Sequence, residues 1–321
     1  MSLGKGDDKL PMLMTTANRR DFMRAVAGAA AGLSFTWRAA GQAAPPSIKV
    51  EKLTANLAVV SGDGGNIGLV IAPDSLMMVD GGYANRFADL QKTVSEADAH
   101  PLRLLVNTHW HVDHVGANVA LGKEGVRIMA HDNCRKWLSQ RVVSVAFANP
   151  NEALPPEGLP TQTFDKGGKM TWGKQKITYA HYPLAHTDSD VYLFFPGDNV
   201  LQTGDLFFNK TYPVIDYTTG GWIGGMHMAL ESLLKVGDAK TRIIPGHGPM
   251  ATKEDMKASR DMLQLVHERL ESANKAGKTM DDVLKDPPVK DLNDTWGKGF
   301  MAPDRFLKMA YPSISKHAAK T

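Results

Sequence analysis

The residues best suited to chemistry lie in one short segment, where positions 108–114 read Thr-His-Trp-His-Val-Asp-His. Imidazole and carboxylate groups are the ligands that zinc prefers when no thiolate is available, and a catalytic zinc keeps one position open for water. In an extended segment His109, His111 and Asp113 would project to one side and His114 to the other. A turn within the segment would let this single loop supply two metal ions.

Further ligand types follow other apolar segments of the chain. His186, Asp205 and His247 each lie in a short polar stretch beside such a segment, and Asp80 directly follows the apolar run Met-Met-Val. The single cysteine, Cys134, excludes an internal disulfide and a cysteine-based zinc site. These candidate ligands outnumber the four that one tetrahedral structural zinc uses, which argues against a closed structural zinc site.

The elements that must position these residues alternate between strand and helix signals, twice along the chain. The expected strands are 48–53, 57–61, 67–71, 76–79, 102–106, 126–130, 170–172, 177–182, 191–195, 200–203 and 241–244. The expected helices are 87–94, 117–121, 132–148, 228–236 and one that begins at Thr252, where Asp255 completes a capping box. The glycine-rich stretch 62–65 predicts a hairpin turn beside the site. This order of elements favours an α/β fold with two sheets packed face to face and helices outside.

The H-x-H-x-D-H motif, with His, Asp and His in this order downstream, resembles the metallo-β-lactamase superfamily. The resemblance runs from about residue 48 to the helix after Pro249 and implies an αββα four-layer sandwich. It implies these roles: His109, His111 and His186 as ligands of one metal, Asp113, His114 and His247 as ligands of the second, Asp205 as the bridging carboxylate, and Asp80 as an orienting acid behind the ligands.

The chemistry that the resemblance implies is hydrolysis with two zinc ions, iron and manganese being the alternative metals. Two such cations lower the pKa of a shared water from ~15.7 toward ~7, and Asp113 orients the resulting hydroxide or passes its proton. The expected substrate is a small molecule with an amide, lactone or thioester carbonyl, and β-lactamase-like activity falls within this class. Phe208 stands where one β-lactam-degrading branch has a substrate-binding Lys, and Asp205 is more similar to the hydroxyacylglutathione hydrolase branch.

Two other functions stay open at this point. An iron-dependent sulfur dioxygenase uses a similar H-x-H-x-D-H frame with one redox metal. A non-catalytic periplasmic accessory protein is the second alternative, although the intact ligand set argues against it. Metal analysis separates the first alternative from the hydrolase, because two zinc ions per chain favour hydrolysis and one iron favours oxygen chemistry.

Substrate contacts are expected from Trp110 at the mouth of the site and from the segment 207–225, which contains Tyr212 and Trp222. His227 is a further candidate for the substrate cleft, and packing within the loop is an equally good interpretation of the aromatic residues. The remaining histidines are interpreted as structural: His100, His131, His181, His267 and His317.

The N-terminal segment predicts export. Arg19 and Arg20 precede a weakly apolar run of about a dozen residues, shorter than the roughly 20 that span a bilayer, which is typical of a twin-arginine signal. We therefore expect the twin-arginine machinery as a partner, a periplasmic location, and no stable membrane insertion after cleavage. Residues 1–44 contain six basic and three acidic residues, so they account for the whole net charge of +3. The remaining chain is neutral, which argues against nucleic-acid binding.

The expected domain organisation has three parts. Residues 1–44 form the signal, 45–275 form the metallo-β-lactamase domain, and 276–321 form a polar, proline-containing helical extension without a core of its own. The sequence predicts no particular oligomeric state.

Overall fold

The computed structural model describes residues 47–62 and 64–318. The expected export signal, with Arg19 and Arg20, lies outside the described residues. Within the described part of the chain, no helix has the length and hydropathy that crossing a bilayer requires.

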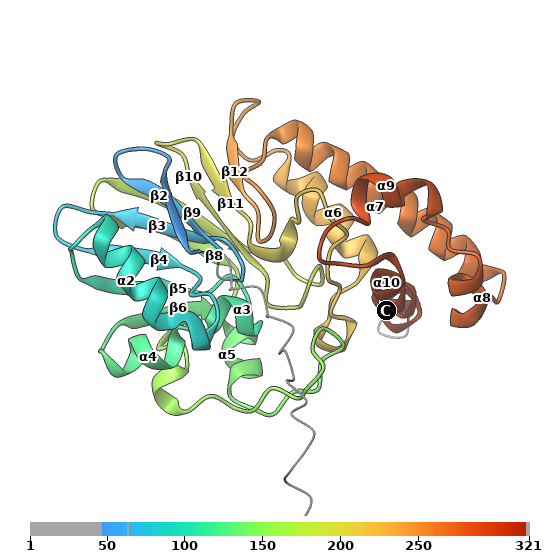
Figure 1. The fold of residues 1–321 in the computed structure, drawn as a ribbon, viewed down its shortest axis with the longest axis horizontal. Coiled ribbons are helices and arrows are strands. Elements are labelled where there is room, and N and C mark those ends of the chain that lie inside the picture. The colour runs from blue at the N-terminus through green and yellow to red at the C-terminus, as the bar shows by residue number, and fades with distance from the viewer. Residues whose placement is uncertain (1–46, 63, 319–321) are drawn as a thin grey trace, which may run out of the picture. The chain divides into compact units, whose positions relative to one another are not determined.

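Two sheets form the centre of the structure (Figure 1). The first has seven strands in chain order: β1 Lys49–Lys52, β2 Leu57–Ser61, β3 Ile67–Ile71, β4 Leu76–Val79, β5 Leu102–Val106, β6 Arg127–His131 and β7 Gln162–Phe164. The second has five, in the order β12 Arg242–Ile244, β11 Val200–Gln202, β10 Val191–Phe195, β9 Gln175–His181 and β8 Gly167–Trp172. In the first sheet β1 to β4 pair antiparallel and β4 to β7 pair parallel, whereas in the second only β11 and β12 are parallel.

Helices cover the outer face of each sheet. Those that follow strands of the first sheet are α2 Phe87–Ala97, α3 Val112–Val115, α4 Asn118–Lys123 and α5 Asp132–Leu138. Those beside the second sheet and after it are α6 Ile223–Leu233, α7 Lys253–Lys275, α8 Met280–Lys285, α9 Asn293–Trp296 and α10 Pro303–Ala318. This arrangement confirms the expected αββα sandwich (Figure 1).

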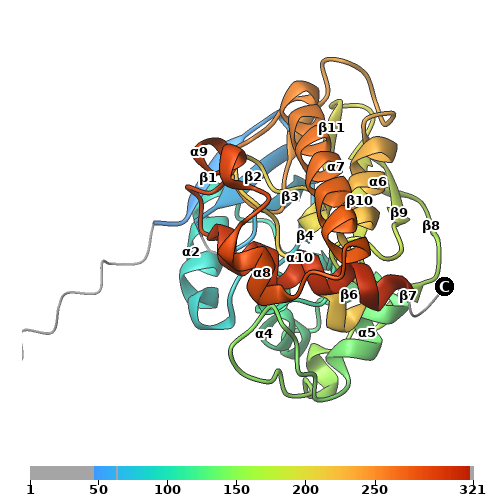
Figure 2. The same cartoon turned by 90° about the vertical axis from the view of Figure 1, so that its right-hand side faces the viewer.

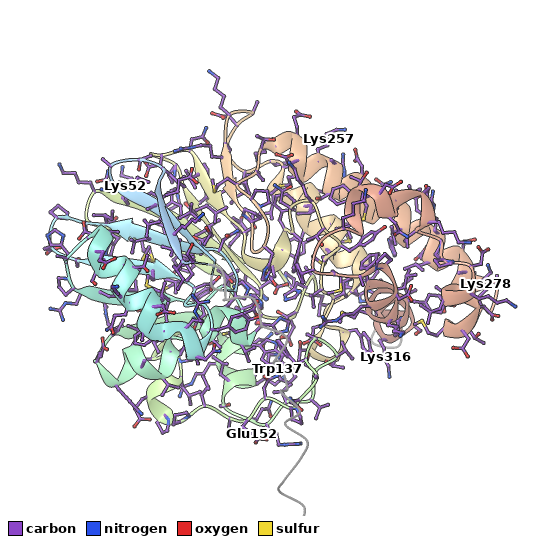
Figure 3. All side chains as sticks on the ribbon, viewed as in Figure 1. Lys52, Trp137, Glu152, Lys257, Lys278 and Lys316 are labelled. Atoms are coloured by element: carbon purple, nitrogen blue, oxygen red, sulfur yellow. The ribbon has the colours of Figure 1, made fainter. Side chains whose placement is uncertain are left out.

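The alternation of side chains along β4 explains the layers. Met77 and Val79 are buried against the second sheet, in the same cluster as Leu193, while Leu76 and Met78 are buried on the opposite face, in the cluster that contains Leu90 of α2. A strand that is apolar at every position therefore serves two cores at once, as a central strand with both faces covered must. Charged side chains such as Lys52, Lys257 and Lys278 are exposed on the outside of these layers (Figure 3).

The C-terminal region is helical as predicted, but its packing differs from the expected appendage. Phe306, Leu307 and Ala310 of α10 are fully buried in the cluster that also contains Met226 of α6 and Val266 of α7. Figure 2 shows α10 crossing beside the end of α7, and α10 contacts α6, α7 and α8. The apolar residues of α10 recur at helical spacing, so this region completes the core of the outer helical layer.

Two expected helices differ in extent from the observed ones. The helix expected over 132–148 ends at Leu138, and the chain continues as a loop whose ends pair through Val142 and Asn151. The helix expected from 228 begins at Ile223 and therefore includes Gly225. A glycine is needed at this position because a Cβ would lie 1.7 Å from the carbonyl oxygen of Leu184. Close packing, rather than a turn, accounts for this glycine. The helix after Thr252 and its capping box are confirmed.

Candidate metal centre

Carboxyl ends of parallel strands bring most of the candidate ligands to one edge of the sandwich. In the first sheet β4 leads to Asp80 and its parallel neighbour β5 leads to His109. In the second sheet β11 leads to Asp205, and its parallel neighbour β12 leads to His247. Parallel strands end at the same edge, so polar loops from both sheets meet there, and the connection before β10 adds His186.

The first group consists of His109, His111, His186 and Asp205, whose ligand atoms all lie within 4.8 Å of one another. All four side chains are buried. The Nε2 atom of His186 lies 2.8 Å from Nδ1 of His111 and 3.4 Å from Oδ2 of Asp205. Nε2 of His109 lies 3.7 Å from the same carboxylate oxygen. Three imidazole nitrogens therefore surround one side of the Asp205 carboxylate.

The second group consists of Asp113, His114 and His247. Nε2 of His247 lies 3.2 Å from Oδ2 of Asp113 and 3.4 Å from Nε2 of His114. The other oxygen of Asp205, Oδ1, lies 3.2 Å from Nε2 of His114 and 3.4 Å from Nε2 of His247. Each oxygen of Asp205 thus faces a different group, which is the geometry of a bridging ligand.

The segment 108–114 is not extended throughout, contrary to the simplest expectation. His111 ends the extended part, and the short helix α3 begins at Val112. The helical turn places Asp113 with His114 in the second group, whereas His109 and His111 serve the first. One loop therefore supplies ligands to both groups, which the turn within it makes possible.

The residues present fit divalent cations. Nε2 of His109 and Oδ1 of Asp205 are buried and have no hydrogen-bond partner among the described residues. Unpartnered buried polar atoms are rare because each one costs desolvation free energy, and a bound ion is a standard explanation. Buried imidazole and carboxylate atoms that converge in this way form a donor set suited to zinc.

Close packing at two glycines supports this convergence. A Cβ at Gly246 would lie 2.0 Å from Oδ1 of Asp205, and one at Gly65 would lie 2.2 Å from Cε1 of His114. Gly65 belongs to the connection between the antiparallel strands β2 and β3, so the predicted hairpin turn beside the site is confirmed. Any side chain at either position would displace a candidate ligand.

Asp80 lies behind the ligands, where the resemblance placed it. Its Oδ1 accepts a hydrogen bond from the backbone N–H of Thr108 at 2.7 Å, and its Oδ2 accepts from the Thr108 hydroxyl at 2.8 Å. Oδ2 also lies 2.8 Å from Nδ1 of His114. When that nitrogen donates, Nε2 of His114 is left to bind a metal.

Asp216 performs the same task for His111, and it was missed in the sequence. Its Oδ2 lies 3.1 Å from Nε2 of His111 and accepts hydrogen bonds from the hydroxyls of Ser144 at 2.7 Å and Thr219 at 2.8 Å. Nδ1 of His111 is thereby directed toward the first group. The stretch Asp-Tyr-Thr-Thr-Gly at 216–220 carries a turn signal, but no spacing connects it with a histidine 105 residues earlier.

Asp190, also missed, shapes the loop that carries His186. Its Oδ2 accepts hydrogen bonds from the backbone N–H groups of His186 at 2.8 Å and Thr187 at 2.9 Å. Burial raises the pKa of Asp190 to about 7, although these hydrogen bonds oppose the shift. On the ring side, Nδ1 of His186 lies 2.8 Å from the carbonyl oxygen of Val214, so Nε2 is the nitrogen that faces the first group.

The two groups differ in protonation before any metal binds. Burial, together with neighbouring imidazoles, lowers the pKa of His109 well below its usual value. Burial also opposes the charged form of His247, but the carboxylates of Asp205 and Asp113 outweigh it and raise the pKa of His247 to about 9. The pKa of Asp113 falls to about 2 despite burial, because His114 and His247 stabilise its ionised form. The second group is therefore a cluster of ion pairs, and the first is a set of neutral imidazoles.

A cavity of about 420 Å³ opens over both groups. His111, Asp113, Asp205 and His247 contribute to its floor. Its walls are formed chiefly by these residues: Tyr83, Phe147, Val214, Phe300 and Arg305. Phe300 and Arg305 come from the C-terminal region, where the sequence offered no signal for a site.

The four residues expected to contact substrate do not line this cavity. Trp110 is buried, and its Nε1 donates to the hydroxyl of Thr219 at 3.2 Å. Tyr212 is buried with its ring stacked on Phe306, and Trp222 is stacked on His317. His227 lies half-buried on α6.

These large rings are more stable inside a core than at a wet cavity. The structure therefore gives Trp110, Tyr212 and Trp222 the packing roles that were the alternative interpretation.

Comparison with known proteins agrees with this geometry. The sequence profile of the family described as "Metallo-beta-lactamase superfamily" matches residues 60–247, more than half of the chain. Hydroxyacylglutathione hydrolase GloC of Haemophilus influenzae is 29% identical over 188 residues, which cover 57% of this chain and 84% of that protein. A metallo-beta-lactamase type 2 of Bacillus sp. (strain 170) is 22% identical over 200 residues, 61% of this chain and 72% of that protein.

Solved structures show the same fold. A metallo-beta-lactamase from Pontibacter korlensis superposes with a TM-score of 0.56 at 19% identity and covers 68% of this chain and 99% of its own. The metallo-beta-lactamase IND-7 also gives a TM-score of 0.56, at 17% identity, with 68% of this chain and 98% of its own covered. The matched family segment ends at His247, so Phe300 and Arg305 lie beyond it.

Proposed function

The chain belongs to the metallo-beta-lactamase superfamily and is a metal-dependent hydrolase, and we propose that it works with two zinc ions on the carbonyl group of an amide, lactone or thioester. The observation that carries the proposal is the position of Asp205. Its two carboxylate oxygens face two separate groups of nitrogen ligands, at 3.4 Å from His186 and 3.2 Å from His114. A single metal ion would need only one of these groups.

The ligands divide between two ions in this proposal. One ion would be held by His109, His111 and His186, the other by Asp113, His114 and His247, with Asp205 shared. When bound, such a pair supplies an activated water and polarises the substrate carbonyl. We assign the carbonyl oxygen of the substrate to the ion held by the first group, called the three-histidine group below. We assign the leaving atom to the ion held by the second group, which contains Asp113.

Asp113 is the residue proposed to move the proton. It lines the cavity floor, and its low pKa, about 2 before any metal binds, keeps the carboxylate ionised at neutral pH. An ionised carboxylate at this position can accept a hydrogen bond from the attacking water, orient it and take up its proton. Asp113 would then pass this proton to the leaving atom, so that one water is consumed and the acid and the protonated leaving group are released.

The cavity walls position the substrate, and the hydrogen bonds behind the ligand histidines position the ligands. Tyr83, Phe147 and Phe300 give the cavity an aromatic lining that binds the apolar part of a substrate and excludes bulk water. Asp80 and Asp216 fix the orientation of His114 and His111. Catalytic geometry of this kind depends on such support, because small displacements of ligands reduce rates strongly.

The relatives support the substrate classes in this proposal without selecting one. One is named a hydroxyacylglutathione hydrolase and another a metallo-beta-lactamase, so thioesters and cyclic amides both belong in the first substrate panel. Export to the periplasm by the twin-arginine route remains part of the proposal and rests on Arg19 and Arg20.

The test is a substrate panel on metal-quantified protein. We expect two zinc ions per chain, turnover of at least one ester, lactone, thioester or β-lactam, and loss of both zinc and turnover with a chelator. Asp205→Ala removes the shared ligand without adding bulk, so metal content and activity should fall together. Full two-metal occupancy in Asp205→Ala would contradict the bridging role. One iron per chain with oxygen consumption would contradict the hydrolase.

A further inference from the structure

We propose that Arg305 forms an anion subsite in the cavity and that the enzyme prefers substrates whose acyl part carries a carboxylate. This inference rests on the proposed function and specifies the substrate of that same site. It assigns a specificity role to α10, which lies outside the segment that matches the family.

The charge pattern of the cavity is the first observation. Apart from the histidines, Arg305 is the one basic side chain among the described residues that line it. The remaining wall is mostly apolar or aromatic, and the two lining carboxylates, Asp113 and Asp205, belong to the candidate metal groups. Divalent cations on those carboxylates would neutralise them, so the cavity of the loaded enzyme presents a net positive surface with an isolated guanidinium.

The hydrogen bonding of Arg305 is the second observation. Its Nη2 donates to the carbonyl oxygen of Ala146 at 2.8 Å, and no other partner is found for the guanidinium among the described residues. Arginine has five N–H donors in a planar fork that matches a carboxylate. The Ala146 bond therefore fixes the direction of the side chain and leaves donors for a second, bidentate partner.

The location of the guanidinium determines which part of the substrate it meets. Ala146 precedes Phe147, whose ring lies 4.8 Å from the ring of His111 in the three-histidine group. Phe300 lies beside the second group, with its ring 5.2 Å from the ring of His247. Arg305 is thus tied to the side that we assign to the carbonyl oxygen, so it meets the acyl part of a bound substrate rather than the leaving group.

A purely structural role makes a different prediction. If Arg305 only tethers the loop at Ala146, its loss would slow all substrates alike. An anion subsite instead changes the ratio between charged and neutral substrates, because a hydrogen bond to a charged group contributes more than one to a neutral group.

The experiment uses two esters that differ in one charge, p-nitrophenyl hydrogen glutarate and its methyl ester, with zinc-loaded full-length protein. Hydrolysis of either consumes one water and releases p-nitrophenol and the free acyl acid. We expect kcat/KM to be about tenfold or more higher for the charged ester, mainly through KM. In Arg305→Gln the ratio should fall close to one, and in Arg305→Lys it should stay intermediate. Arg141→Gln, an exposed change in the same loop region, should leave the ratio as in the wild type.

The outcomes separate the two proposals. Failure of the wild type on both esters, and on the wider panel, would overturn the proposed function. Hydrolysis of both at equal rates would overturn the anion subsite alone, as would an unchanged ratio in Arg305→Gln. Equal losses on both esters in Arg305→Gln, with unchanged zinc content and melting temperature, would show a tether only.

The side of the subsite is tested with a second pair, S-acetyl-3-mercaptopropionate and its methyl ester, in which the charge lies on the leaving group. We expect little preference within this pair. A preference confined to it would overturn the placement on the acyl side.

Discussion

The carboxylate of Asp216 lies 3.1 Å from Nε2 of His111, on the ring edge opposite the nitrogen that faces the other ligands. Two hydroxyl groups donate to the same carboxylate oxygen, so its position is fixed independently of the histidine. Desolvation opposes its charge, but the hydrogen bond and positive charge of His111, together with the hydroxyls of Thr218 and Ser144, outweigh it and lower the pKa of Asp216. The carboxylate therefore stays ionised and keeps Nδ1 of His111 available as a ligand.

Asp216→Asn should weaken zinc binding at the three-histidine group by roughly 10–100-fold, because the amide accepts a weaker hydrogen bond and can rotate its N–H₂ group toward His111. Competition with a chromophoric chelator measures this affinity. Asp286→Asn, which removes an exposed partner of Lys290, serves as the matched control and should leave zinc affinity unchanged. Equal affinities in both variants would show that Asp216 does not support His111.

The candidate ligands were predictable because they follow strands that the apolar pattern reveals. Buried strands such as β4 and β5 carry a strong signal, and polar residues directly after them meet at one sheet edge. Asp80 and His109 are of this kind. From strand geometry alone Asp113 would join His109 and His111, and its place beside His114 in the second group depends on the helical turn at α3, which four residues of sequence do not specify.

The supporting residues were not predictable, since tertiary packing alone brings them to the site. Asp216 is 105 residues from His111, and Arg305 is 159 residues from its partner Ala146. The sequence around Asp216 is that of an ordinary surface turn, and the sequence around Arg305 is that of an ordinary amphipathic helix, so neither pattern indicates a functional site. The roles expected for the aromatic residues differ from the observed ones for the same reason. An aromatic side chain suits both the lining of a cavity and a core, so the residue type of Tyr212 does not reveal that it is buried in the core.

Export is tested by replacing both Arg19 and Arg20 with Lys. The twin-arginine route depends on the paired arginines, so we expect the precursor to accumulate uncleaved in the cytoplasm. Fractionation followed by immunoblotting measures this, with Arg38→Lys as a control close to the expected cleavage site. Normal processing of the double variant would contradict the assignment.

Metal binding to the second group should release protons. The pKa of His247 is raised to about 9 before metal binds, so this ring is protonated at pH 7, whereas ligation requires its neutral form. The apparent affinity of the second group should therefore rise as pH increases from 6.5 toward 9 and then level off. Calorimetric titration of chelator-treated protein with zinc, in two buffers of different ionisation enthalpy, measures the protons released. Binding without proton release at pH 7 would contradict the raised pKa.

The two metal groups should also be separable by mutation. His247→Ala removes a ligand of the second group only, and the three-histidine group keeps the three protein ligands that a catalytic zinc needs. Loss of activity should be largest on substrates with poor leaving groups, because these depend most on stabilisation of the departing charge. His186→Ala should instead reduce all substrates alike. Zinc counting, with rates on a matched pair of good and poor leaving groups, tests both variants. Identical losses on both substrates in both variants would show that the division of labour is wrong even if every ligand is right.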